Sequence, residues 1–158
     1  MGDEIRYFPA TSGGPPSTPA LSTLRRAELI RGVEIFSQAT VEELYRLAGV
    51  ARVVEFAPAG VIFGENDLGD NLYVLVEGSV ELISETEQLR ETTGPGDAIG
   101  LVSVLTRQPR RVKATAVEAT VALSIAGEDL FTVLSNNMEI LVSIFRTLAE
   151  KFDMGERG

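Results

Sequence analysis

The stretch Gly96-Asp97-Ala98-Ile99-Gly100-Leu101-Val102-Ser103-Val104-Leu105-Thr106-Arg107-Gln108-Pro109-Arg110-Arg111-Val112-Lys113-Ala114-Thr115 decides how the rest of the chain is interpreted. A glycine turn leads into one short apolar helical turn, and a polar loop with a proline and two arginines follows. The first N–H groups of a helix have no partner inside it, and a nearby guanidinium adds a bidentate contact to an anion. This order of residues favours an anion site, although a surface turn with an exposed arginine gives the same pattern.

The composition excludes several kinds of chemistry. The 158 residues include no cysteine and no histidine. Disulfides, thiolate nucleophiles, serine–histidine triads and histidine-bound zinc are therefore excluded. The carboxylates show no spacing typical of an acid–base pair, and a solvated surface accounts for them. We expect no metal site, no cofactor and no enzymatic activity.

The charge of the chain limits its partners and location. A formal net charge of −9 repels a phosphate backbone, so we expect no direct contact with nucleic acid. Asp3 and Glu4 are followed by no apolar run, and no apolar stretch is long enough to span a bilayer. We expect a cytoplasmic protein without a membrane span, a location that the absence of cysteine fits.

The first third of the chain divides into a lead and two helices. Residues 1–20 are rich in glycine, proline and serine, which predicts a flexible lead. Apolar residues then recur at helical spacing from a Ser22 or Thr23 cap to about Gly32. Thr40-Val41-Glu42-Glu43 resembles a capping box and predicts a second helix that ends near residues 49–51. Residues 21–51 are therefore expected to be helical.

The middle of the chain, residues 52–125, has the pattern of short strands between turns. Gly78 allows the positive φ of a tight hairpin. Strands of this length, separated by regular turns, indicate a compact antiparallel roll or barrel. The predicted strands cover residues 53–56, 61–63, 72–76, 80–83, 89–92, 112–117 and 120–125.

The C-terminal part, residues 128–153, is predicted to be helical. A short helix over 128–134 is followed by a longer one over 138–152, and a tail follows at 154–158. The longer helix has an apolar stripe formed by Met138, Leu141, Phe145, Leu148 and Phe152, and Ile140 and Ile144 widen it. This stripe fits packing on the roll, a homodimer contact through residues 138–152, or a lid over a ligand.

In this order the motifs resemble the cyclic nucleotide-binding domain family. The resemblance implies an α+β, mainly β fold over residues 21–153. Its core is an eight-stranded antiparallel jelly roll, or double-stranded β-helix, flanked by N-terminal and C-terminal helices. It also identifies residues 96–111 as the family's phosphate-binding cassette. The matching residues are Phe36, Pro58, Ile62-Phe63, Glu65, Gly69-Asp70, Leu72-Tyr73, Glu77-Gly78, Gly96-Asp97, Gly100 and Pro109-Arg110.

The resemblance also implies a set of ligand-binding residues. Arg110 matches the arginine that pairs with the cyclic phosphate, and the backbone N–H groups of about 101–103 point at the same group. We expect Arg110 to be exposed in the pocket, so that Arg110→Ala would remove binding and leave the melting temperature unchanged. The full candidate set is Gly100, Leu101, Val102, Ser103, Arg110, Arg111 and Val112.

The sequence departs from the family pattern at residue 101 and in the residues that follow Arg110. Leu101 stands where the family's binders have a glutamate that accepts a hydrogen bond from the ribose 2′-hydroxyl. Losing such a bond costs about 1.5 to 3 kcal/mol, which weakens binding without abolishing it. Arg111 and Lys113 replace smaller residues, and each side chain points either into the pocket or to solvent. If Arg111 faces the pocket, we expect a more positive field that favours a more highly charged anion.

The resemblance supports two functional hypotheses. The first is a regulatory domain that binds cAMP, cGMP or a related phosphorylated ligand and signals through its C-terminal helix. The second is a degenerate, ligand-free domain of the same fold that acts as a structural or dimerisation module in a larger protein. A transcription factor of this family would continue into a helix-turn-helix, whereas this sequence ends at Gly158.

Overall fold

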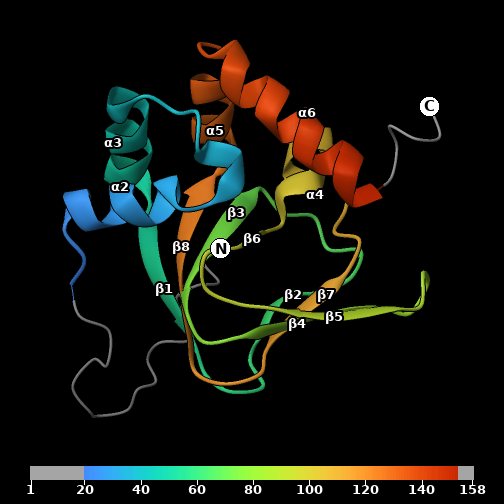
Figure 1. Cartoon of the computed structure of the whole chain (residues 1–158). Helices are drawn as coiled ribbons and strands as arrows, with labels where there is room; N and C mark the ends of the chain where they lie inside the picture. The colour runs from blue at the N-terminus through green and yellow to red at the C-terminus, as the bar shows by residue number, and fades with distance from the viewer. Residues whose placement is uncertain (1–19, 153–158) are drawn as a thin grey trace.

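The short strands pair into two four-stranded antiparallel sheets in the computed structural model, which describes residues 20–152 (Figure 1). One sheet has the order β1-β8-β3-β6 and the other has the order β2-β7-β4-β5. This arrangement confirms the predicted jelly-roll class. The predicted tail over 154–158, and all but the last residue of the predicted lead over 1–20, lie outside the described residues. The strands are β1 (Arg52–Phe56), β2 (Val61–Phe63), β3 (Asn71–Glu77), β4 (Val80–Ser84), β5 (Leu89–Thr93), β6 (Ala98–Ile99), β7 (Lys113–Ala116) and β8 (Thr120–Ala126).

The strand pattern missed one short strand and located one hairpin correctly. β6 has only two residues, too few to show a period, and it pairs with β3 through Tyr73↔Ile99 and Val74↔Ala98. Gly78, between β3 and β4, has the expected positive φ of 94°. A Cβ there would lie 2.5 Å from the Ala119 carbonyl oxygen, so close approach of the backbone also requires glycine.

The two N-terminal helices begin at the predicted caps. Helix α2 (Thr23–Arg31) starts after Ser22, whose hydroxyl accepts a hydrogen bond from the Arg25 N–H at 3.0 Å. A short 3-10 helix, η2 (Glu34–Phe36), connects it to α3 (Val41–Val50). Helix α3 starts with the predicted capping box. Its Thr40 hydroxyl accepts from the Glu43 N–H, and the Glu43 carboxylate accepts from the Thr40 N–H.

Two apolar clusters hold the helices and the roll together. Alternate residues of β3 point to opposite faces: Leu72 and Val74 pack with the helices, while Leu75 faces the inside of the roll. The helical cluster includes Phe36, which is fully buried. Figure 1 shows the N-terminal and C-terminal helices gathered at one end of the roll, so segments far apart in sequence share one core.

Helix α6 (Met138–Phe152) follows α5 (Gly127–Leu134) and packs through only part of the predicted wide stripe. Ile140 and Ile144 are almost completely buried, whereas Met138 and Phe145 are 68% and 63% exposed. Part of the predicted stripe therefore packs and part is exposed, because a helix with apolar residues on most sides does not reveal from its spacing which side is covered. Among the described residues, no helix has the length and apolar character needed to cross a membrane.

The start of α6 is tied to the start of α3. The Asn137 side-chain oxygen accepts hydrogen bonds from the N–H groups of Glu139 and Ile140, and its amide nitrogen donates to the Glu43 carboxylate at 2.7 Å. Burial raises the pKa of Glu43, but hydrogen bonds from Thr40 and Asn137 and the charge of Arg46 outweigh it. The pKa of Glu43 therefore lies below its usual value. The hydrogen bond from Asn137 to the Glu43 carboxylate is present at neutral pH and weakens as pH falls through this lowered pKa.

Candidate functional site

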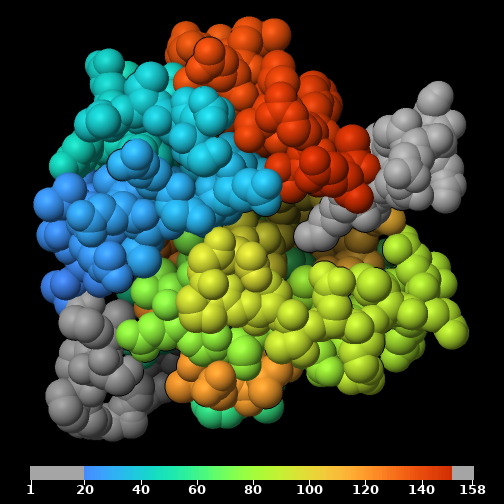
Figure 2. Space-filling model, viewed as in Figure 1, coloured from blue at the N-terminus to red at the C-terminus, as the bar shows by residue number. Residues whose placement is uncertain are grey.

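All seven predicted site residues line one pocket of about 810 Å³. Its walls come from the cassette, from the β4–β5 hairpin, and from η2 and α6, which supply Glu34, Thr147 and Leu148. In Figure 2 the yellow surface that leads into the cassette lies beneath the blue N-terminal helices and the red α6. Within residues 20–152 no group of three or more acidic side chains is placed to hold a metal ion. The predicted residues on the wall are Gly100, Leu101, Val102, Ser103, Arg110, Arg111 and Val112.

Helix α4 (Leu101–Thr106) lies at the centre of the cassette and closely matches the predicted turn over 101–105. Gly100 precedes it with a φ of 87°, and no side chain caps its first turn. The N–H groups of residues 101–103 have no partner inside the helix, because the first intrahelical bond is the one from Val104 to Gly100. The helix thus presents backbone donors beside the pocket.

The Arg110 side chain is buried, with only 3% of the residue exposed. One terminal nitrogen, Nη1, donates to the Ser103 hydroxyl at 2.8 Å and to the Gly100 carbonyl at 3.2 Å; the other, Nη2, donates to the Asn71 carbonyl at 2.8 Å. The guanidinium carbon lies 4.2 Å from the centre of the Phe63 ring. The buried Nε has no hydrogen-bond partner within the described part of the chain.

The charge of Arg110 is matched by dipoles and not by a carboxylate. Its three acceptors are neutral, and the ion pairs of residues 20–152 do not include it. Burial lowers the pKa of Arg110, against the opposite effect of Tyr73, Asp70 and Asp67. A buried charge with no carboxylate in direct contact is costly, so an anion beside it would relieve that cost. The expectation that Arg110 is exposed is wrong. Because that exposure was the reason for expecting an unchanged melting temperature in Arg110→Ala, we now expect the variant to alter it.

Two glycines make room for the Arg110 guanidinium. A Cβ on Gly69 would lie 2.5 Å from Nη2, and a Cβ on Gly100 would lie 2.6 Å from Nη1. In the sequence Gly69 is a motif residue without an evident role, and no pattern there predicts Asn71 and Phe63 as partners of Arg110. Residues that meet across strands leave no spacing signal in the chain.

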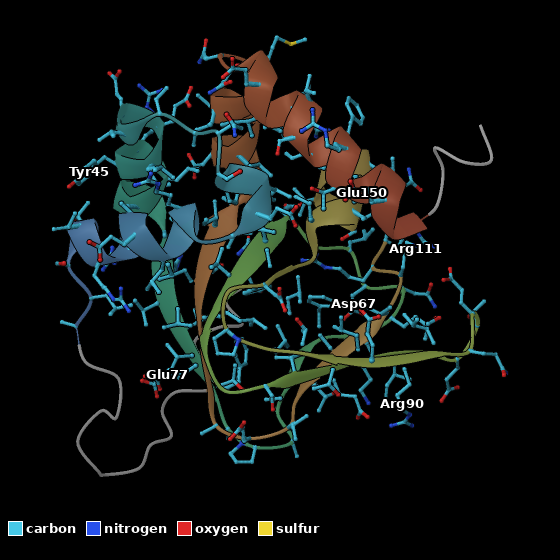
Figure 3. All side chains as sticks on the ribbon, in the orientation of Figure 1. Tyr45, Asp67, Glu77, Arg90, Arg111 and Glu150 are labelled. Atoms are coloured by element: carbon cyan, nitrogen blue, oxygen red, sulfur yellow. The ribbon has the colours of Figure 1, made fainter. Side chains whose placement is uncertain are left out.

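The structure shows where the side chains that depart from the family pattern lie, namely Leu101, Arg111 and Lys113. Arg111 is about half exposed, lines the pocket, and its Nη2 lies 2.9 Å from the Glu87 carboxylate on the β4–β5 turn. Figure 3 places Arg111 below the last turns of α6. Lys113 is exposed on β7, and the pocket wall does not include it. Leu101 is partly buried, lines the pocket and packs against the cluster that contains Ile144.

Comparison with known proteins identifies the family of the chain. The family model of the cyclic nucleotide-binding domain matches residues 53–137, and the chain belongs to that family. The chain is 28% identical over 132 residues to a CRP-like cAMP-activated global transcriptional regulator of Mycobacterium tuberculosis. That alignment covers 81% of this chain and 56% of the relative, so the chain spans about half the length of this curated relative.

Solved structures share the fold at low sequence identity. The sensor domain of the transcriptional regulator DNR from Pseudomonas aeruginosa matches with a TM-score of 0.74 and 14% identity, covering 85% of this chain and 93% of that one. The regulatory domain of Toxoplasma gondii PKA, crystallised with cAMP, matches with a TM-score of 0.72 and 16% identity. This match covers 81% of this chain and 50% of that one.

Substituting Gly69 tests the packing around Arg110. In Gly69→Ala the added methyl group displaces the guanidinium from the Asn71 carbonyl. We expect a loss of about 1 to 3 kcal/mol of stability and a shifted Arg110 Nε–H signal in NMR spectra. Gly49→Ala is the control, because a Cβ there meets nothing within 4 Å in α3 and should raise stability slightly. An unchanged melting curve and Arg110 signal in Gly69→Ala would contradict this geometry.

Proposed function

We propose that this chain is a regulatory domain that binds a cyclic nucleotide, cAMP or cGMP, with the cyclic phosphate at Arg110. The observation that carries this proposal is the buried Arg110, which lines a large pocket and, within residues 20–152, has only neutral acceptors and a buried Nε without a partner. A singly charged phosphate supplies the missing counter-charge and accepts from donors of the guanidinium. The proposed role is regulatory and not catalytic.

The pocket has a polar and an apolar part that suit such a ligand. The first-turn N–H groups of α4 and the Arg110 guanidinium offer donors to a phosphate. Leu82, Leu89 and Val112 give the wall apolar surface for a base. The M. tuberculosis relative is named for activation by cAMP, and the Toxoplasma regulatory domain was crystallised with cAMP. Both support a cyclic nucleotide as the ligand.

The proposed output is a movement of α6. Thr147 and Leu148 of this helix line the pocket, and Leu101 at the start of α4 packs on the cluster that holds Ile140 and Ile144. A ligand shifts the position of α6 only through a different affinity for its two positions. Since Asn137 anchors the first turn of α6, we expect the movement in its second half.

Replacing Arg110 by lysine tests the proposed phosphate contact. Arg110→Lys keeps the positive charge but loses the fork of donors, so affinity should fall about tenfold or more. Calorimetric titration with cAMP and with cGMP measures this change. Arg107→Lys is the matched control, because Arg107 is exposed, packs on the Phe131 ring and does not line the pocket. Equal affinity in the Arg110→Lys and Arg107→Lys variants would contradict the proposal.

If no cyclic nucleotide binds the unmodified chain at millimolar concentration, the regulatory proposal fails. The outcome would favour the degenerate module. A thermal-shift assay with the same ligands provides an independent readout, since a ligand that binds only the folded state raises its melting temperature.

Restoring a carboxylate at residue 101 tests the ribose contact. Leu101→Glu supplies an acceptor for the 2′-hydroxyl, and we expect cAMP affinity to rise about ten- to a hundredfold. The melting temperature should fall, because Leu101 packs against the core. For 2′-deoxy-cAMP the same variant should bring no gain, and an equal gain for both nucleotides would show that the hydroxyl is not the group recognised.

A homodimer contact through 138–152 is also proposed. Met138, Val142 and Phe145 are exposed at four- and three-residue steps along one side of α6. A second copy placing the same stripe against them would remove this apolar surface from water. We expect a dimer in analytical ultracentrifugation and a monomer for Phe145→Glu. Gln38→Glu, which adds the same charge on an exposed loop, should remain dimeric. A monomeric unmodified chain at high concentration would refute this contact.

A further inference from the structure

The outer part of the pocket carries more acidic than basic side chains. Arg110 and Arg111 are the basic residues of its wall, and Arg110 is deeply buried. The acidic residues of the wall are exposed: Glu34 on η2, Glu87 and Glu91 on the β4–β5 hairpin, and Asp97 before the cassette helix. A ligand that reaches Arg110 therefore has its remaining groups near carboxylates.

Glu87 is held in place by a small polar network. Its backbone N–H donates to the Ser84 hydroxyl at 3.0 Å, and that hydroxyl donates to the Glu65 carboxylate at 3.1 Å. Ser84 is 1% exposed, so this support is buried beneath the hairpin turn. The Glu87 side chain then reaches the Arg111 guanidinium at 2.9 Å. The hairpin tip is thus connected to the cassette.

This pairing reverses the expectation drawn from Arg111. The side chain does face the pocket, but its charge is offset by Glu87 and does not create a more positive field. Arg110 remains as the charge to which a ligand anion can pair. A second negative charge on the ligand would find no other basic residue on the wall that lacks a carboxylate partner. It would also be repelled by Glu91 and Asp97.

We propose that Glu87, together with Glu91, restricts this pocket to ligands with one negative charge, so that a phosphodiester is accepted and a phosphomonoester is disfavoured. The proposal rests on the function proposed above, and it names the ligand's charge class. The same carboxylates accept hydrogen bonds, so the outer part of the ligand should be neutral and carry N–H or O–H donors. Glu87 is thus a specificity-determining residue, because its carboxylate offsets the charge of Arg111 as well as repelling a second negative charge on the ligand.

Two small anions test the charge rule without assuming a nucleotide. Dimethyl phosphate carries one negative charge, and methyl phosphate carries two at about pH 8, above its second pKa of about 6. Chemical shifts of the arginine Nε–H groups in the labelled full chain report binding of each. We expect the unmodified chain to bind dimethyl phosphate more tightly than methyl phosphate.

Glu87→Gln keeps the shape of the side chain and removes its charge. We expect its affinity for methyl phosphate to rise about two- to fivefold, with a much smaller change for dimethyl phosphate. Glu85→Gln is the matched control, because Glu85 lies in the same turn, changes the net charge equally and does not line the pocket. It should leave both affinities unchanged.

The outcomes separate this inference from the proposed function. Tighter binding of methyl phosphate by the unmodified chain, equal behaviour of Glu87→Gln and Glu85→Gln, or no shift at Arg110 with either anion would overturn the charge rule. If the rule holds for the small anions but neither cAMP nor cGMP gives heat in calorimetry, the cyclic nucleotide proposal fails and the charge rule stands. If the cyclic nucleotides bind but the two small anions show no charge preference, the charge rule fails and the cyclic nucleotide proposal stands.

Discussion

The burial of the Arg110 guanidinium is the constraint on which the rest of the site depends. A buried charge requires acceptors at its donors, and here the acceptors are the carbonyls of Gly100 and Asn71 and the Ser103 hydroxyl. Gly69 has to lack a side chain for the guanidinium to fit. One side chain therefore holds together the cassette, the loop before β3 and β3 itself. Its hydrogen-bond acceptors are neutral, so its positive charge has no carboxylate in direct contact.

The same site reaches the helices through a few contacts. Leu101 lines the pocket and packs against the apolar cluster that includes Ile140 and Ile144 of α6, so the cassette and that helix share one set of contacts. At its other end α6 is held by Asn137, which caps the helix and donates to Glu43 of α3. One end of α6 is thus anchored to the helical layer, and the other faces the pocket. This arrangement suits a helix that responds to occupancy.

Local signals predicted local structure well. Ser22 and Thr40 cap the helices that they were expected to cap, because a side-chain oxygen three residues before a free N–H forms its bond within one turn of chain. Gly78 adopts its expected positive φ for a similarly local reason. Strand β6 was missed because two residues carry no period. The spacing did not show which part of the α6 stripe is covered, because Ile140, Leu141 and Phe145 offer apolar surface on several sides.

The sequence by itself determined the order of the elements and the glycines of the turns, since these depend on spacing along the chain, and its resemblance to a known family identified the residues that gather in one pocket. Only the tertiary structure decided that Arg110 is buried, that Arg111 faces the pocket and that Glu87 meets it. Glu87 and Arg111 are brought together by the pairing of β4 with β7. Burial and partner choice arise from such pairing between distant segments, and the spacing of residues in one segment does not encode it.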